Sequence, residues 1–156
     1  MYTEVVIGLG NPLFGDEGIG VRLVEALAAD PELSVAGKTH FVDLGTAATR
    51  VLHAIAGKDK AILLDCAFMG LEPGEIRRFN PADVRTQKQI VNFSLHEGDL
   101  LATLALAARL GECPPEVVIF GIQPASIVHS LSLSPVLANR FNEYVSRIKA
   151  EILSAR

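Results

Sequence analysis

Short runs of apolar residues alternate along this chain with segments in which apolar residues recur every three or four positions. The continuous runs predict β-strands that are covered on both faces, and the wider spacing predicts amphipathic helices. The predicted strands are residues 4–9, 40–43, 61–64, 75–79 and 117–120, and the predicted helices are residues 17–29, 48–56, 100–110 and 135–152.

Alternation of strands with helices predicts an α/β fold: a three-layer α/β/α sandwich with a largely parallel five-stranded sheet and helices on both faces. Residues 61–64 are wholly apolar, which places that strand in the centre, whereas 75–79 alternates and lies nearer an edge. Ser134 and Pro135 suit the N-cap and first position of the last helix. Between residues 80 and 96 the pattern is weak and predicts mostly loop.

Composition narrows the class of protein. The 156 residues fit a single domain, 1–156, and the net charge of −4 argues against a nucleic-acid partner, which usually requires a basic surface. No apolar run approaches the ~20 residues of a membrane span, and the N-terminus lacks the positive segment of a signal peptide. Two cysteines make no disulfide framework. We therefore expect a cytoplasmic protein without a membrane partner.

Acidic residues follow the first three predicted strands. Asp16 and Glu17 come after the first strand, Asp43 ends the second, Asp65 ends the third, and His96 lies just before the third helix. The carboxyl ends of parallel strands meet at one edge, where open α/β sheets bind ligands. Two carboxylates and an imidazole on separate elements fit a three-ligand site for a divalent ion such as nickel or zinc.

Each of these residues also has a simpler role open to it. Asp16 and Glu17 stand at a helix start, where acidic side chains cap free N–H groups; we assign this role to Asp16. Asp43 could cap the turn that follows it, and His96 could face solvent from a polar loop. Asp65 follows four buried apolar residues, so its carboxylate needs a partner or a cleft, which favours a functional role.

Covalent catalysis has no clear candidate in the sequence. Cys66 follows Asp65 and points to the opposite face if the strand continues, which predicts a buried, inert thiol. Cys113 precedes two prolines and has no nearby base. The Gly-x-Ser-x-Gly and His-Glu-x-x-His motifs are absent from the sequence.

Four sequence blocks, in order and at compatible intervals, together resemble the nickel-iron hydrogenase maturation endopeptidases. They are Gly8-Leu9-Gly10-Asn11 with Asp16-Glu17-Gly18-Ile19-Gly20-Val21, then Asp43-Leu44-Gly45-Thr46, then Ile62-Leu63-Leu64-Asp65-Cys66-Ala67, and last Gly121-Ile122-Gln123-Pro124 with Leu133-Ser134-Pro135 downstream. One position departs from the family pattern: Leu44 replaces the first glycine of the second block.

The resemblance implies a phosphorylase/hydrolase-like fold and an endopeptidase that removes the C-terminal extension from the nickel-loaded precursor of a [NiFe]-hydrogenase large subunit. It implies that Glu17, Asp65 and His96 bind the metal and that Asp43 joins them in the catalytic set. Nickel is then expected to arrive with the precursor, while zinc or cadmium could occupy the same residues in vitro. Nothing in the sequence demands more than a monomer.

Two alternatives share parts of this pattern. Peptidyl-tRNA hydrolases also open with a strand and Gly-Leu-Gly-Asn-Pro, as at residues 8–12, but their catalytic histidine and asparagine block is absent here, and an acidic chain suits tRNA poorly. A dinucleotide-binding module would use Gly8, Gly10 and Asp43. Leu13 occupies the position of its third glycine, and Asp43 comes later than the expected ~20 residues.

Overall fold

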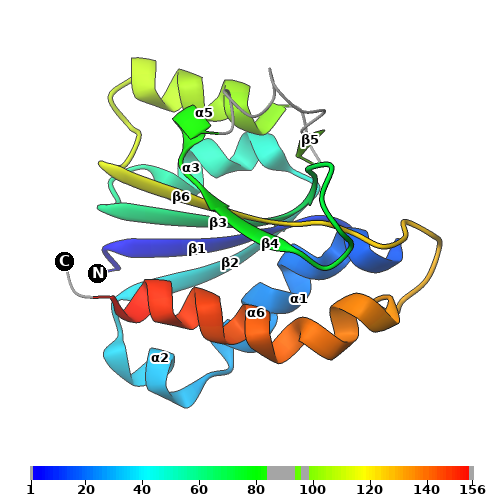
Figure 1. Cartoon of the computed structure of the whole chain (residues 1–156). Helices are drawn as coiled ribbons and strands as arrows, with labels where there is room; N and C mark the ends of the chain where they lie inside the picture. Colours follow the sequence, from blue (N-terminus) through cyan, green and yellow to red (C-terminus); the bar gives the residue numbers. More distant parts are fainter. Residues whose placement is uncertain (1, 84–93, 96–98, 155–156) are drawn as a thin grey trace.

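A twisted β-sheet runs through the middle of the molecule, as a computed structural model that describes residues 2–83, 94–95 and 99–154 shows (Figure 1). Five strands lie in the order β2-β1-β3-β6-β4, and a short sixth strand, β5, pairs with the end of β3. The strands are β1 (Glu4–Leu9), β2 (Thr39–Gly45), β3 (Lys60–Phe68), β4 (Ile76–Phe79), β5 (Ser94–Leu95) and β6 (Glu116–Ile122).

Helices cover both faces of the sheet. They are α1 (Ile19–Ala28), α2 (Pro31–Ala36), α3 (Val51–Ile55), α5 (Asp99–Arg109) and α6 (Pro135–Leu153), with short 3₁₀ turns η1 (Gly15–Gly18) and η2 (Ala48–Arg50). Figure 1 shows α3 and α5 on one face and α1 and α6 on the other. The predicted three-layer α/β/α sandwich is therefore confirmed. None of the described helices combines the length and apolar character that a membrane crossing needs.

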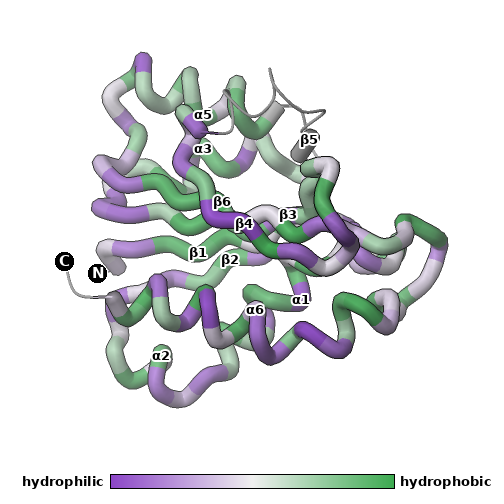
Figure 2. Tube along the Cα trace, viewed as in Figure 1, coloured by the Kyte–Doolittle hydropathy of each residue, from purple (hydrophilic) through white to green (hydrophobic). Residues whose placement is uncertain are grey.

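Side-chain alternation along the strands builds two separate apolar layers. Leu63 of β3 packs with Val51 and Leu104 on the α3 and α5 face, whereas its neighbours Ile62 and Leu64 pack into the layer under α1 and α6. Figure 2 shows the apolar residues concentrated along the central strands. A strand segment that is buried on both faces is mostly apolar, which is why the apolar run of residues 61–64 identified β3 as central.

The parallel direction of four strands brings their carboxyl ends to the same edge of the sheet. β1, β2, β3 and β6 are parallel, and β4 is antiparallel to β6 at the edge of the sheet. The chain passes from β1 to β2 on one side of β1 and on to β3 on the other side. The carboxyl ends of β1 and β3 thus form a topological switch point, where open α/β sheets bind ligands.

Two local features differ from the predicted pattern. Asp30 and Pro31 end the first helix as predicted, but they also begin α2, because the Asp30 carboxylate accepts hydrogen bonds from the backbone N–H groups of Glu32 (2.9 Å) and Leu33 (3.3 Å). The first turn of the predicted helix 17–29 is the 3₁₀ turn η1. Most of the loop predicted between residues 80 and 96 lies outside the described residues.

Candidate active site

The turn after β1 packs so closely that two of its positions require glycine. Gly10 has a φ of +123°, and a Cβ there would overlap the carbonyl group of Glu17. At the start of α1, a Cβ on Gly20 would overlap the carbonyl oxygen of Leu64 on β3. The backbone of η1 and α1 therefore lies directly against the ends of β1 and β3, and this packing holds Glu17 at the switch point.

Asp65 lies at the same edge, near the end of β3. Its side chain is fully buried, whereas that of Glu17 is half-buried. Burial raises the pKa of the adjacent Cys66 thiol, and the negative charges of Asp65, Asp16 and Glu17 raise this pKa further. The 3₁₀ turn η1, which carries Glu17, contacts β3, which carries Asp65, so the two acids lie at the same edge of the sheet.

Cys66 is buried on the α1 and α6 face, in the layer that contains Ile62 and Leu64. Strand alternation puts Asp65 on the opposite face, with Leu63 and Ala67. The prediction of a buried thiol is confirmed. A thiol with a raised pKa and no access to solvent is a poor nucleophile.

Asp43 caps the turn that follows β2, which is the simpler of the two roles that the sequence allows it. Its Oδ1 accepts a hydrogen bond from the Gly45 N–H (2.8 Å), while the Gly45 carbonyl accepts one from the Gly10 N–H (2.7 Å). The turn after β2 is thereby tied to the turn after β1. Asp43 itself is exposed, so its carboxylate is accessible at this edge.

The departure at Leu44 does not disturb this turn. Leu44 ends up buried in the apolar layer beside α3, and the left-handed conformation falls on Gly45, with a φ of +53°. Among the described residues, every residue with a positive φ is a glycine. Leucine is therefore compatible with the backbone at this position.

His96, the predicted third ligand, lies outside the described residues. Within the described part of the chain, no three histidine, cysteine, aspartate or glutamate side chains gather closely enough to hold a metal ion. The metal-binding set of Glu17, Asp65 and His96 therefore stays a prediction, of which the structure places two members.

The role assigned to Asp16 was wrong. Its side chain is fully buried and does not cap its own helix; its carboxylate accepts backbone hydrogen bonds from Ala125 (2.9 Å), Ser126 (3.1 Å) and Ser134 (2.7 Å). Sequence spacing placed this acid at the start of the helical segment, where the 3₁₀ turn η1 leads into α1. It could not show that a segment more than 100 residues away would pack against that start and supply the N–H donors.

Gln123 is a further residue whose position the sequence did not reveal. It is buried after β6, and its side-chain oxygen accepts hydrogen bonds from the backbone N–H groups of Met69 (2.7 Å) and Leu71 (3.4 Å). The segment that follows Asp65 is therefore held by the segment that follows β6. A polar side chain directly after a buried apolar strand was the one available signal.

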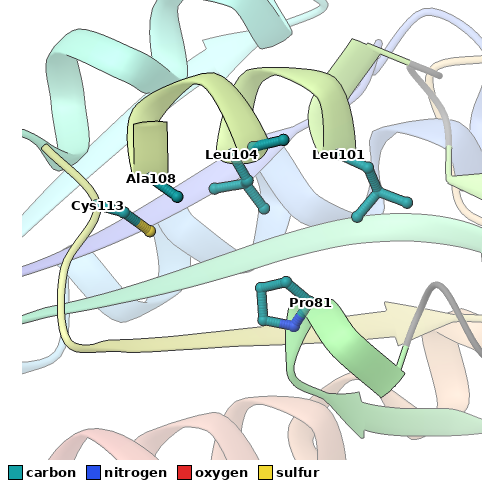
Figure 3. Close-up of a pocket in the computed structure, with 6 residues that line it drawn as sticks. Pro81, Leu101, Leu104, Ala108 and Cys113 are labelled. Carbon is teal, nitrogen blue, oxygen red and sulfur yellow. The ribbon is translucent and has the colours of Figure 1, made fainter. Parts of the chain in front are cut away.

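A small apolar cavity of about 170 Å³ lies away from this edge, between α5 and the segment after β4 (Figure 3). The described residues that line it are Pro81, Leu101, Leu104, Ala105, Ala108 and Cys113. Among the described residues that line it, the Cys113 thiol is the one ionisable group, and burial raises its pKa. The carboxyl edge of the sheet is thus the better candidate for chemistry.

A family model, relatives by sequence and solved structures all point to the same protein family. A family model described as hydrogenase maturation protease matches residues 21–151, a range that contains Asp43, Asp65 and His96 and begins after Glu17. The hydrogenase 3 maturation protease of Escherichia coli K12 is 32% identical over 124 residues, which cover 78% of this chain and 73% of the relative.

Two further similar proteins differ in how much of their own length this chain covers. The hydrogenase expression/formation protein HupD of Thiocapsa roseopersicina is 33% identical over 123 residues, 79% of this chain, but the chain spans only 55% of that relative. The fold matches the hydrogenase maturating endopeptidase HybD from E. coli with a TM-score of 0.81 at 24% identity, over 97% of this chain and 92% of HybD. The chain belongs to the hydrogenase maturation protease family.

Proposed function

We propose that this protein is an endopeptidase that removes the C-terminal extension from the nickel-loaded precursor of a [NiFe]-hydrogenase large subunit. Family membership supports this activity and favours it over the peptidyl-tRNA hydrolase and dinucleotide-binding alternatives. The observation that carries the proposal is the close packing of the turn that carries Glu17 against β3, which carries Asp65, at the switch point of the sheet.

In this proposal the nickel belongs to the substrate, and Glu17, Asp65 and His96 bind it. Carboxylate oxygens and an imidazole nitrogen are suitable nickel ligands. A buried carboxylate such as that of Asp65 is expensive to desolvate, and a cation beside it offsets that penalty. The bound ion would orient the precursor and could polarise the scissile carbonyl or lower the pKa of a water. Zinc or cadmium would occupy the same residues in vitro.

The remaining residues of the site define what the protein itself contributes. Asp43 is exposed at the same edge, with one oxygen held by Gly45, so it can contact the incoming peptide or accept a proton from water. Cys66 is buried and its pKa is raised, which does not favour a covalent thiol mechanism. We therefore infer that water, rather than the Cys66 thiol, attacks the scissile peptide bond.

We also propose that the protein acts as a monomer in the cytoplasm. Both of its cysteines are free, which agrees with a reducing compartment. Intact-mass spectrometry tests the function: the protein is incubated with a large-subunit precursor, with and without nickel. The proposal expects loss of a C-terminal peptide from the nickel-loaded precursor alone. A nickel-loaded precursor that stays intact would contradict it.

A further inference from the structure

The buried carboxylate of Asp16 joins two segments that are distant in sequence. Its Oδ2 accepts hydrogen bonds from the N–H groups of Ala125 and Ser126, and its Oδ1 accepts one from the N–H of Ser134. Ser134 is the N-cap of the long helix α6, whose dipole favours a negative charge at this end. One side chain therefore fixes both ends of the loop of residues 125–134.

Backbone contacts reinforce the same junction. The Gly15 N–H donates to the Ser130 carbonyl (2.8 Å), and the Ser130 N–H donates to the Leu13 carbonyl (2.9 Å). Phe14 packs edge-on against His129, with ring centroids 5.4 Å apart. The turn that precedes Glu17 is therefore bound to the loop of residues 125–134 by both main chain and side chain.

Glu17 lies between two such fixed points. Asp16 precedes it, and Gly18 follows it so close to Pro12 that an added Cβ would come within 2.5 Å of the Pro12 Cα. A residue whose neighbours on both sides are fixed has little freedom to move. A side chain that is already oriented before the metal ion arrives binds that ion more tightly.

We propose that Asp16 is a positioning residue for the proposed reaction: its carboxylate holds the turn that carries Glu17 in the orientation that meets the metal. This inference rests on the proposed function. It assigns to Asp16 no contact with the substrate, since the side chain is fully buried.

The most direct variant is Asp16→Asn. An amide keeps the size of the side chain but turns one acceptor into a donor that faces a backbone N–H, so at least one of the three hydrogen bonds is lost. Glu4→Gln is a matched control, because Glu4 is also buried and accepts a hydrogen bond, from Thr39 Oγ1 (2.8 Å), at the start of β1. Both variants are compared at a temperature at which circular dichroism shows them folded.

Three measurements separate positioning from a purely structural role. For Asp16→Asn we expect faster amide exchange at Ala125, Ser126 and Ser134, and about 10-fold weaker Ni(II) or Cd(II) binding by calorimetry. We also expect a lower kcat and, because the nickel is part of the substrate, a higher KM, so that kcat/KM falls about 10-fold or more. Glu4→Gln should keep wild-type metal affinity and kcat even where its melting temperature falls. Wild-type metal affinity and kcat in folded Asp16→Asn would overturn the inference.

A second pair guards against a variant that does not fold. Ser134 has a φ of −58°, which proline tolerates, so Ser134→Pro removes the N–H that donates to Asp16, while Ser134→Ala removes only the capping hydroxyl. We expect Ser134→Pro, relative to Ser134→Ala, to weaken metal binding and lower kcat. Equal values for the two variants would contradict the inference.

The outcomes also separate this inference from the proposed function. A wild type that processes the nickel-loaded precursor, beside an Asp16→Asn variant that does so equally well, defeats only the role of Asp16. A wild type that binds metal but cleaves no precursor defeats the endopeptidase proposal, while the metal titrations still decide the role of Asp16. A wild type that neither binds metal nor cleaves defeats both.

Discussion

Gly20 of α1 lies directly on Leu64 of β3, where a Cβ on the glycine would overlap the leucine carbonyl oxygen. Leu64 precedes Asp65, and Gly20 follows Glu17 by three residues, so this contact sets how closely the two acids approach. The glycine is therefore needed for the site as well as for the fold.

We accordingly expect Gly20→Ala to lower the free energy of unfolding by about 3 kcal/mol and to impair processing, because the helix must move off the strand. Urea denaturation and a processing assay measure the two effects. Gly57→Ala serves as control: its added Cβ meets no atom within 4 Å, although its φ of +71° introduces strain of about 1 kcal/mol. Full activity and stability in Gly20→Ala would contradict this account of the contact.

Asp65→Asn should separate stability from activity. Removal of a buried charge with little change of shape is expected to leave the free energy of unfolding within about 1 kcal/mol of wild type, or to raise it. Processing should fall below detection, because a proposed metal ligand has been neutralised. Denaturation curves and cleavage assays on the same preparation provide the comparison. An Asp65→Asn variant with normal cleavage would remove Asp65 from the site.

The two roles of Asp43 can be distinguished by a pair of substitutions. Asp43→Asn keeps an oxygen that can accept the hydrogen bond from the Gly45 N–H, whereas Asp43→Ala loses it. If the charge contributes to the reaction, both variants lose activity, but only Asp43→Ala also loses about 1 kcal/mol of stability. Retained activity in Asp43→Asn would reduce Asp43 to the capping role.

The change of protein stability at acid pH should depend on Glu151, which lies in the last turn of α6. Its hydrogen bond from Arg78 (2.9 Å) and its ion pair with Lys60 (2.7 Å) lower its pKa from 4.5 to about 2. A lowered pKa in the folded state stabilises the protein above pH 4.5, and this stabilisation is lost as pH falls from 4.5 towards 2.

Glu151→Gln should therefore have a free energy of unfolding about 1–2 kcal/mol below that of wild type at pH 7. The expected loss is moderate because Arg78 is exposed and solvent screens its charge. The difference between the two proteins should shrink at pH 3. Urea denaturation at the two pH values measures it. A gap between the two proteins that stays the same at both pH values would show that the ionised carboxylate is not the source of the stability.

Much of the architecture could be predicted because burial on both faces leaves a clear mark in sequence. The wholly apolar run of residues 61–64 in β3 predicted a central strand. The Ser134-Pro135 pair predicted the start of α6, where the Ser134 hydroxyl accepts a hydrogen bond from the Leu137 N–H (3.5 Å). Local signals of this kind depend only on neighbouring residues.

The features that escaped prediction depend on contacts between distant parts of the chain. The antiparallel direction of β4 follows from its pairing with β6, which its own residues do not specify. Asp16 looked like a cap because its partners, such as Ser134, lie far along the sequence. Glu17 and Asp65 were expected together because parallel strands end at one edge, a rule of topology that needs no such detail.

We propose that this protein uses Glu17 to recognise nickel in a hydrogenase precursor before it cleaves. The intact mass of nickel-loaded and nickel-free precursor, measured after incubation with wild type or with Glu17→Gln, tests this recognition. We expect only the wild type to shorten the precursor, only when nickel is present, and only by a C-terminal peptide. Equal cleavage by Glu17→Gln, or cleavage of the nickel-free precursor, would contradict it.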